Sequence, residues 1–264
     1  MDYSRFFSVD FEAETRIVVV TLDVAKDKYN SFGPDFVMAL KELLGYYEMN
    51  REVKGLILTA AGDRVFSTGA DISGHFPQLD PVSAREFSHY GQQVFSMLAH
   101  APYLTLAAIN GFALGGGLEI CLACDFRIAS KRGRLGLPEI NLGLMPGWGG
   151  TQRLPRLIGY ERAAWLILSG EPISAEKALE WGLVSAVVAP DELLNAARKF
   201  LSRLTEKSGD ALRVAKRAMV CGLEGVLPSG LAVENELFGL IWSSSDREEG
   251  VKAFLEKRKP KFTT

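Results

Sequence analysis

Apolar residues in the first half of the chain switch between short continuous runs and longer runs with helical spacing. The continuous runs are rich in Val, Ile and Leu and are bounded by polar or turn residues, which is typical of buried strands. Pro34 and Pro81 each open a stretch whose apolar residues recur at helical spacing, which predicts a helix. Strands that alternate with helices in this way predict α/β units and a largely parallel sheet. The runs expected to form strands are residues 17–22, 55–59 and 104–109.

The second half of the chain has a mostly helical pattern after residue 150. Ser174 is a candidate N-cap for a helix that ends near Gly182. Residues 245–248 (Ser-Asp-Arg-Glu) fit a capping box that starts a last helix, which Pro260 would stop. Further helices are expected over residues 191–204 and 211–223.

Length and composition favour one well-packed core. The chain has 264 residues, of which 47% are hydrophobic, so a sizeable core is expected. Together with the patterns above, this predicts an α/β core over residues 1–200 and a helical region over residues 201–264. The formal net charge of −2 gives no reason to expect nucleic acid or an anionic membrane as a partner. No window reaches ~18 uninterrupted apolar residues, so no membrane span is predicted.

The N-terminus and the cysteines both favour a cytoplasmic protein. Residues 1–5 lack a cationic stretch followed by an apolar run, so no signal peptide is predicted. The chain has 3 cysteines, and an odd number without a framework suits a reducing compartment. Cys121 and Cys124 form a C-x-x-C, which suggests a redox or metal pair only in the right context. No second pair and no nearby His completes such a site, so we expect small buried residues on one face of a helix.

Two glycine-bearing segments follow predicted strands and are the first candidates for a ligand site. Residues 110–119 (Asn-Gly-Phe-Ala-Leu-Gly-Gly-Gly-Leu-Glu) contain consecutive glycines, which weaken any regular element. Residues 66–72 (Phe-Ser-Thr-Gly-Ala-Asp-Ile) form the other segment. Because ligands bind beyond the carboxyl ends of parallel strands, each segment could supply one backbone N–H to a single oxyanion. A tight strand-to-helix turn is an equal alternative, whereas a phosphate loop fails because its glycine spacing is absent.

A carboxylate in an apolar stretch is a further candidate. Glu139 lies within residues 135–151, directly behind a proline and among apolar residues. Burying a carboxylate is costly unless the group is used or paired. Most glutamates are solvated at the surface, so Glu139 taken alone would be unremarkable. The glycine-bearing segments elsewhere in the sequence make Glu139 a candidate catalytic residue.

The motifs taken together resemble the crotonase (enoyl-CoA hydratase/isomerase) superfamily over essentially the whole chain. The resemblance implies a crotonase-like α/β fold, a spiral of ββα units with a helical C-terminal region that forms trimers. No single motif is decisive, but the set in this order is highly specific. The motifs are residues 66–71 (Phe-x-x-Gly-Ala-Asp), 113–119 (Ala-Leu-Gly-Gly-Gly-Leu-Glu), 124–125 (Cys-Asp), 136–139 (Gly-x-Pro-Glu), 146–154 (Pro-Gly-x-Gly-Gly-Thr-Gln-Arg-Leu) and 254–260 (Phe-Leu-Glu-Lys-Arg-Lys-Pro).

The resemblance implies that the protein is an enoyl-CoA hydratase, a hydro-lyase that adds water across the 2,3 double bond of a thioester. By motif position, the two backbone donors of the oxyanion hole fall on Ala70 and Gly116. Similar hydratases carry glutamate at both positions that match Glu119 and Glu139. Glu119 is then expected chiefly to activate water, and Glu139 chiefly to deliver the proton to C2.

The resemblance also suggests which residues contact the substrate. Phe254 and Lys257 would approach the ligand of a neighbouring subunit, although Lys257 could equally be a solvated residue on a helix face. Trp148 occupies a position that is often small, and its indole would either narrow the acyl pocket or pack against a neighbouring helix. The candidate contacts to coenzyme A lie in residues 66–72 and directly after them, and they are Ser67, Asp71, Ile72 and Ser73.

The substrate and the finer activity stay open at this stage. Residues 73–76 (Ser-Gly-His-Phe) lack charges that relatives often carry, and His75 is given no catalytic role. A double-bond isomerase and a cyclic dienoyl-CoA hydratase or hydrolase are the alternatives. A non-catalytic acyl-CoA-binding protein is disfavoured because it would not need both glutamates. We expect a role in fatty acid metabolism, no metal, no cofactor other than the coenzyme A of the substrate, and a homotrimer or dimer of trimers.

Overall fold

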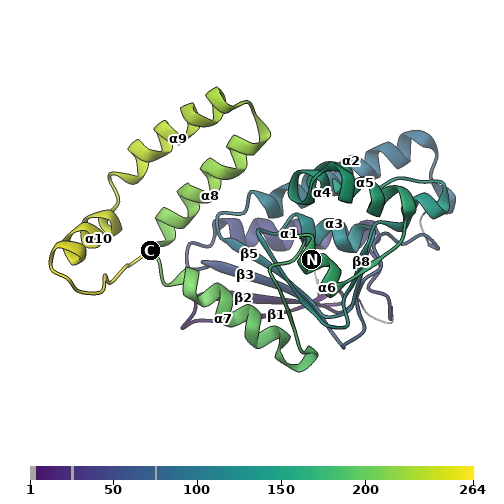
Figure 1. Cartoon of the computed structure of the whole chain (residues 1–264), viewed down its shortest axis with the longest axis horizontal. Helices are drawn as coiled ribbons and strands as arrows, with labels where there is room; N and C mark the ends of the chain where they lie inside the picture. The colour runs from purple at the N-terminus through teal and green to yellow at the C-terminus, as the bar shows by residue number, and fades with distance from the viewer. Residues whose placement is uncertain (1–3, 25–26, 75) are drawn as a thin grey trace.

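The computed structural model describes residues 4–24, 27–74 and 76–264. Figure 1 shows a layered α/β core and an arm of helices that projects from it. Residues 1–3 of the stretch without a signal-peptide pattern, and His75, lie outside the described residues. No helix in the described part of the chain is long and apolar enough to cross a membrane.

The strands form a larger and a smaller sheet. All three predicted strands are confirmed, and they lie side by side in the larger sheet as β2, β3 and β5 with parallel pairing. In order across the larger sheet, the strands are β1 (Phe7–Glu12), β2 (Ile17–Leu22), β3 (Gly55–Ala60), β5 (Leu104–Ile109), β7 (Phe126–Ser130) and β10 (Ala186–Val188). Across the smaller sheet they are β4 (Val65–Ser67), β6 (Phe112–Leu114), β8 (Arg134–Gly136) and β9 (Ile173–Ser174).

The helices cover the sheets and build the arm. Pro34 and Pro81 open helices as predicted, and Ser174 caps a helix by accepting a hydrogen bond from the Lys177 N–H. The α-helices are α1 (Pro34–Met49), α2 (Pro81–Ala99), α3 (Gly116–Leu122), α4 (Gly150–Ile158), α5 (Tyr160–Ser169), α6 (Ala175–Glu180), α7 (Leu193–Thr205), α8 (Gly209–Glu224), α9 (Leu227–Ile241) and α10 (Ser245–Leu255). Short 3-10 helices are η1 (Phe76–Gln78), η2 (Pro138–Leu142) and η3 (Pro190–Glu192).

The core repeats one unit along the chain, namely a strand of the larger sheet, a short strand of the smaller sheet and a helix. β3, β4 and α2 form one unit, β5, β6 and α3 the next, and β7, β8 and α4 the one after. This is the ββα repeat that the resemblance implies. The short strands β4, β6 and β8 have 3 residues each, too few for a periodic pattern to reveal them. Apolar periodicity therefore detects the longer strands of this fold and misses the smaller sheet.

The start of the last helix differs from the prediction by one residue. The N-cap of α10 is Ser244, whose hydroxyl accepts a hydrogen bond from the Asp246 N–H, and not Ser245. The helix ends at Leu255, so Pro260 lies beyond its end and is not what stops it. Ser243, Ser244 and Ser245 are consecutive in the sequence, and only the backbone conformation decides which of them is the cap.

Helix α7 belongs to the core, although the expected boundary at residue 200 falls within it. The apolar face of α7 packs Leu193, Ala197 and Leu201 into a buried cluster with residues of the larger sheet. The arm therefore begins with α8, at Gly209, and continues through α9 and α10 (Figure 1).

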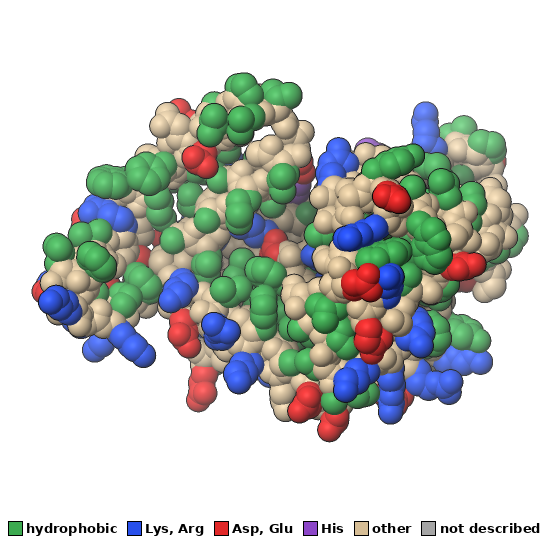
Figure 2. All heavy atoms as spheres, in the orientation of Figure 1, with side chains coloured by type: hydrophobic (Ala, Val, Ile, Leu, Met, Phe, Trp, Pro, Cys, Tyr) green, Lys and Arg blue, Asp and Glu red, His purple; other side chains and the backbone are tan. Residues whose placement is uncertain are grey.

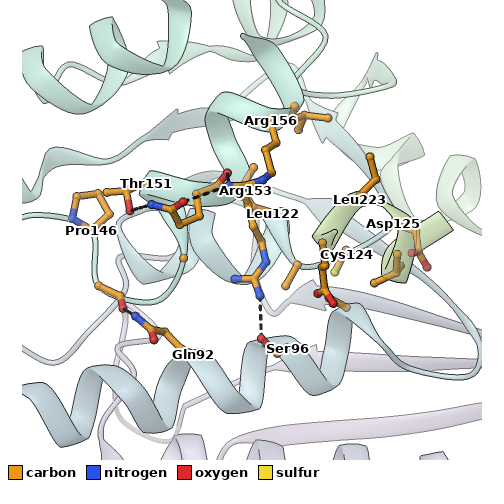
Figure 3. A pocket seen from close by; sticks show the side chains of 18 of the residues that line it. Gln92, Ser96, Leu122, Cys124, Asp125, Pro146, Thr151, Arg153, Arg156 and Leu223 are labelled. Atoms are coloured by element: carbon orange, nitrogen blue, oxygen red, sulfur yellow. Dashed lines mark hydrogen bonds between the residues drawn. The ribbon is translucent and has the colours of Figure 1, made fainter. Parts of the chain in front are cut away.

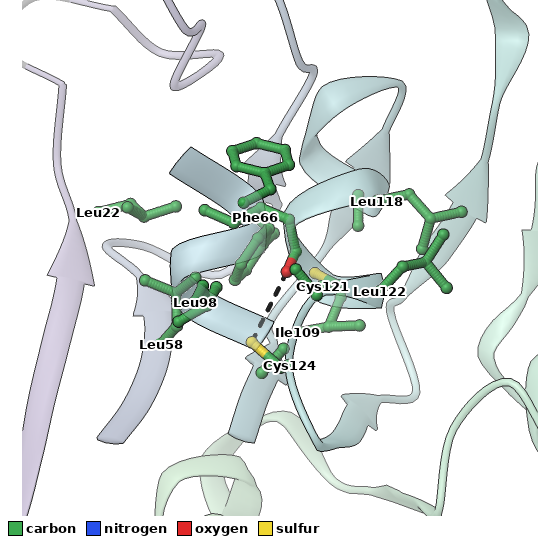
Figure 4. Close-up of a cluster of buried hydrophobic side chains, with 14 of the residues drawn as sticks. Leu22, Leu58, Phe66, Leu98, Ile109, Leu118, Cys121, Leu122 and Cys124 are labelled. Carbon is green, nitrogen blue, oxygen red and sulfur yellow. Dashed lines mark hydrogen bonds between the residues drawn. The ribbon is translucent and has the colours of Figure 1, made fainter. Parts of the chain in front are cut away.

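Cys121 and Cys124 lie inside the core, as expected for small buried residues. Figure 4 shows both among apolar side chains that include Phe66 and Leu98. The Cys124 thiol donates to the Ile120 carbonyl at 3.6 Å. Burial raises the pKa of the Cys124 thiol to about 12, so it remains a neutral thiol. The C-x-x-C is a packing feature here.

A buried ion pair ties the arm to the core. Lys216 Nζ in α8 lies 2.8 Å from Asp125 Oδ2 and donates to the Tyr103 carbonyl at 2.8 Å. Asp125 Oδ2 also accepts the Thr105 N–H at 2.7 Å. The Lys216 side chain is only 5% exposed, so water would not easily replace these contacts. Removing either charge would leave the other buried without its counter-ion.

We expect the Lys216→Met substitution to lower the free energy of unfolding by about 3 kcal/mol, because Asp125, whose side chain is only 18% exposed, would lose its counter-ion. Urea unfolding followed by circular dichroism measures this. The Asp125→Asn/Lys216→Met double variant should recover much of the loss, since no lone charge remains. Arg217→Met, at an exposed neighbouring position on α8, is the matched control. A Lys216→Met protein as stable as that control would contradict the expectation.

Candidate active site

Three strands of the smaller sheet end at one edge. β4, β6 and β8 pair in parallel, with Ser67 opposite Ala113 and Leu114 opposite Gly136. Parallel strands deliver the residues that follow them to the same side of a sheet. The segments that follow these strands therefore meet, and the residues they bring together are Ala70, Gly116, Glu119 and Glu139.

Ser67 and Gly69 shape the segment that follows β4. The Ser67 hydroxyl donates to the Asn30 carbonyl at 2.7 Å and accepts the Gly69 N–H at 3.0 Å. Gly69 has φ of +90°, a conformation that residues with a Cβ rarely adopt. A Cβ at this position would lie 2.5 Å from the Gly116 nitrogen. Only glycine therefore lets the segments after β4 and β6 come into contact here.

Two backbone N–H groups border the cavity where these segments meet. Ala70 and Gly116 both line it. In the bridge between Phe32 and Ala70, the Phe32 N–H donates to the Gly69 carbonyl and the Asp71 N–H donates to the Phe32 carbonyl. The Ala70 N–H takes no part in this bridge. Gly116 is the first residue of α3, where an N–H has no acceptor within the helix. Within the described part of the chain neither N–H is hydrogen-bonded to another residue, so both are available to a ligand oxygen.

Glu119 is almost completely buried and is held by backbone N–H groups. It lies in α3 and is 2% exposed. Its Oε1 accepts the Trp148 N–H at 2.8 Å and the Gly150 N–H at 2.7 Å. A Cβ on Gly150 would lie only 3.0 Å from that oxygen, so the glycine permits the close approach. Burial raises the pKa of Glu119, whereas the two N–H donors and the charge of Arg153 act to lower it.

Glu139 faces the same cavity from η2 with fewer partners. Its Oε2 is buried and has no hydrogen-bond partner among the described residues. Burial raises the pKa of Glu139 to about 7, and the nearby Glu119 carboxylate adds to the rise. One carboxyl group thus accepts two N–H donors, while the other has an oxygen that accepts none. This difference favours an ionised Glu119 beside a protonated Glu139 near neutral pH.

Both carboxyl groups line a cavity of about 350 Å³, and Trp148 forms part of its wall. The indole is 4% exposed and makes edge contacts with Phe87 and Phe95 at centroid distances of 5.3 and 5.4 Å. It fits between Gly91 of α2 and Gly116, where a Cβ would lie 2.2 and 2.6 Å from ring atoms. Trp148 therefore lines the cavity and also packs against a neighbouring helix, and a narrowing of the acyl pocket stays a prediction.

Some of the other predicted contact residues line the cavity and some do not. Ser67 lies beneath its segment with its hydroxyl engaged, and it does not line the cavity. Asp71 accepts the N–H and the hydroxyl of Ser73 at 3.1 and 2.9 Å, which shapes the turn beside the cavity. Phe254, 82% exposed, and Lys257 lie at the end of the arm, so their contact with a ligand in a neighbouring subunit stays a prediction. Those that line the cavity are Ala70, Ile72, Gly116, Glu119, Glu139 and Trp148.

Sequence patterns missed some residues that shape the cavity. Phe87 belongs to the apolar stripe of α2, and this stripe is typical of core packing as much as of a pocket wall. Arg153 lies in a recognised motif, but the motif alone does not show that its charge acts on Glu119. The apolar wall residues that were not predicted include Phe87, Leu142, Leu144 and Met145.

The arrangement offers electrostatic and acid–base chemistry. Two free N–H groups can stabilise negative charge on one oxygen, and two unlike carboxyl groups can take and give a proton. In the ranges that the structure describes, no group of three or more His, Cys, Asp or Glu side chains is arranged to hold a metal ion.

Comparisons with known proteins point to one family. A family model described as enoyl-CoA hydratase/isomerase matches residues 12–264. A short-chain-enoyl-CoA hydratase of Clostridium acetobutylicum is 40% identical over 252 residues, which cover 96% of each chain. A crotonyl-CoA hydratase of Syntrophomonas wolfei is 38% identical over 255 residues, which cover 97% of each chain. The crystal structure of an enoyl-CoA hydratase from Bacillus anthracis, 38% identical, superposes with a TM-score of 0.90 over 97% of this chain and 98% of that one.

Proposed function

The chain belongs to the enoyl-CoA hydratase/isomerase family and is an enoyl-CoA hydratase, and we propose that Glu119 and Glu139 together carry out the hydration. The observation that carries this proposal is the meeting of two unlike carboxyl groups and two free N–H groups at one cavity. Each of these groups corresponds to one need of the reaction.

The two free N–H groups form the oxyanion hole in this proposal. The thioester carbonyl oxygen accepts hydrogen bonds from Ala70 and Gly116 and keeps them as negative charge develops in the enolate. One donor of this kind contributes about 3–4 kcal/mol of transition-state stabilisation in other enzymes. The contact between Gly69 and Gly116 supports the proposal because it brings the segments that carry the two donors together.

The two carboxyl groups move the protons. Glu119, as the carboxylate, takes a proton from water while the water oxygen bonds to C3, and the π electrons of the double bond move into the enolate. Protonated Glu139 then gives its proton to C2, and the carbonyl re-forms. One water molecule has been added, and a proton passed from Glu119 to Glu139 restores the starting state. The two N–H donors on Glu119 and the unpartnered oxygen of Glu139 support this division of roles.

The presence of both carboxyl groups favours hydration over the alternatives. Moving a double bond requires a proton to be taken and returned, which a single carboxylate can do. A binding protein would gain nothing from burying two acids, since each costs free energy unless it is used. Glu119 and Glu139 both line the cavity, which supports hydration.

A short acyl chain is the substrate that we propose. Trp148 lines the same cavity as the two carboxyl groups and packs against Phe87 and Phe95. A rigid aromatic wall sets a limit on the length of chain that fits. The relatives named as short-chain-enoyl-CoA and crotonyl-CoA hydratases agree with this substrate class.

The cellular context is also a proposal. Coenzyme A enters as part of the substrate, and the oxyanion hole and the carboxyl pair supply the chemistry without a further cofactor. We propose a cytoplasmic homotrimer or dimer of trimers that acts in fatty acid metabolism. Hydrophobic side chains gather over the arm (Figure 2), which supports burial against other subunits. Those of the arm that are more than half exposed include Leu223, Leu227, Phe238, Trp242 and Phe254.

The Gly69→Ala substitution tests the oxyanion hole. A Cβ at φ of +90° and 2.5 Å from the Gly116 nitrogen must displace one of the two donors, so we expect kcat/KM for crotonyl-CoA to fall about 100-fold. Loss of the conjugated-thioester absorbance measures the rate. Gly62→Ala is the control, because Gly62 has φ of +75° but open space around it. Equal losses in both variants would mean that backbone strain alone explains the effect.

Substituting each glutamate tests the proton transfers. Glu119→Gln and Glu139→Gln keep the size of the side chain but remove its acid–base function, so each should lower kcat about 1,000-fold. Calorimetry should find the affinity for an unreactive CoA thioester within a few-fold of the wild-type value. Turnover like that of the wild type in either variant would sink the paired mechanism.

The pH dependence of the wild-type enzyme complements these variants. A proton donor must be protonated, and Glu139 with a pKa of about 7 loses its proton as the pH rises through that value. We therefore expect kcat/KM to fall on the alkaline side of about pH 7. A rate that stays flat up to pH 9 would contradict the assignment of Glu139 as the donor.

Shortening the aromatic wall tests the limit on chain length. Trp148→Phe keeps the aromatic cluster but opens space, so we expect kcat/KM for an eight-carbon enoyl-CoA to rise about 10-fold relative to crotonyl-CoA. The ratio of the two rates is the readout. Trp165→Phe, in α5 and outside the cavity, is the matched control. An unchanged ratio in Trp148→Phe would place the limit elsewhere.

A further inference from the structure

The loop whose N–H groups bind Glu119 is itself hydrogen-bonded to other side chains through its carbonyl groups. Residues 143–149 join η2 to α4, and the N–H groups of Trp148 and Gly150 point at the Glu119 carboxylate. On the other side of the loop, the Gly147 carbonyl accepts hydrogen bonds from the Ser88 hydroxyl at 2.7 Å and from Gln92 Nε2 at 2.8 Å. The carbonyl of Gly147 is thus fixed by α2, away from Glu119.

Arg153 makes the second contact on this outer side. Its Nη1 donates to the Trp148 carbonyl at 3.0 Å, and its Nη2 donates to the Ser96 hydroxyl at 3.2 Å (Figure 3). The guanidinium lies against Gly149, where a Cβ would be 2.1 Å from Nη1. Ser96 is one helical turn beyond Gln92 on α2. One face of α2 and Arg153 therefore hold two successive carbonyls of the loop.

Arg153 is also the cation that acts on Glu119 through this loop. The Arg153 guanidinium donates to a carbonyl and to a hydroxyl, and no carboxylate among the described residues forms an ion pair with it. Burial lowers the pKa of Arg153, and the charges of Glu119 and Glu224 oppose that change. Its charge in turn favours the ionised form of Glu119.

Several other charged groups lie around Arg153 and Glu119. Arg153 borders a second cavity of about 650 Å³ on the side of the loop away from the carboxyl pair (Figure 3). The charged groups that line this cavity besides Arg153 are Asp125, Arg127, Arg156 and Glu224. Glu139 faces Glu119 across the first cavity. Arg127 is engaged with carbonyls at the end of α3, including that of Cys124 at 2.6 Å.

We propose that Arg153 is a positioning residue for the hydration: by holding the Trp148 carbonyl it fixes the Trp148–Gly149 peptide, which lies between the two peptides whose N–H groups bind Glu119, and its positive charge stabilises the Glu119 carboxylate that activates water. This inference rests on the proposed function of the carboxyl pair. The same residue does both tasks because its guanidinium donates to the carbonyl of Trp148, the residue whose own N–H binds the carboxylate. A role confined to packing would require neither its charge nor its bond to the Trp148 carbonyl.

The test compares Arg153→Met, Arg153→Lys and Arg156→Met in crotonyl-CoA hydration across pH. Without the cation, Glu119 should hold its proton to higher pH, so the acid limb of kcat/KM in Arg153→Met should move up by about one pH unit. At the optimum, kcat should fall about 10-fold while KM stays within about twofold. Arg153→Lys keeps the charge, so its acid limb should stay within about 0.3 units of the wild-type position.

Arg156→Met is the matched control. Arg156 lies one turn along the same helix and lines the same cavity, but its Nη1 donates to Gln152 and not to the loop. It should keep wild-type kcat and an unshifted profile. An Arg153→Met profile that superimposes on the wild-type profile, or a fall in kcat with no shift of the acid limb, would overturn the inference.

A second variant covers the case in which Arg153→Met does not fold. Gln92 is exposed, and Gln92→Met removes one bond to the Gly147 carbonyl without a change of charge. We expect kcat to fall about threefold at unchanged KM, because the loop is held less firmly. Wild-type kcat in this variant would then overturn the inference that holding the loop positions Glu119. Wild-type turnover of crotonyl-CoA tests the proposed function separately, so a failure confined to these variants counts only against the positioning role.

Discussion

The parallel alignment of β4, β6 and β8 is the constraint on which the site depends. Because these strands run in the same direction and pair in register, the segments that follow them reach the same edge of the smaller sheet. The contact between Gly69 and Gly116 then brings two of the segments together, which no residue with a Cβ would allow. Lys216 and Asp125 help to join the arm to the core, and the segments that carry Ala70, Gly116, Glu119 and Glu139 all belong to the core.

The two glutamates acquire different properties from their surroundings. Glu119 is buried but receives two N–H donors and the field of Arg153, whereas Glu139 has a buried oxygen without a donor. Two identical carboxyl groups in one dry cavity would repel each other and compete for the same proton. In the proposed mechanism, their unequal environments separate the roles of base and acid, which is what addition of water to a double bond requires. We propose that hydration depends on this difference between the surroundings of the two acids.

Much of this account could be predicted from the sequence, and the failures have physical causes. The strands β2, β3 and β5 were found because they are long enough to show an apolar run, while the 3-residue strands of the smaller sheet are not. Motifs named Ala70, Gly116, Glu119 and Glu139, but not the side-chain positions, so Ser67 was taken as a substrate contact although its hydroxyl supports the backbone. The bond from Arg153 to Ser96 joins residues 57 apart, and no local pattern encodes such a contact.

A crystal structure of the Glu119→Gln variant with crotonyl-CoA would test the central claim most directly. The account predicts that the thioester carbonyl oxygen lies within about 3.2 Å of both the Ala70 and the Gly116 nitrogen, with C2 and C3 between the side chains at 119 and 139. It would be contradicted by a carbonyl oxygen that lies more than about 3.5 Å from either nitrogen in the bound thioester.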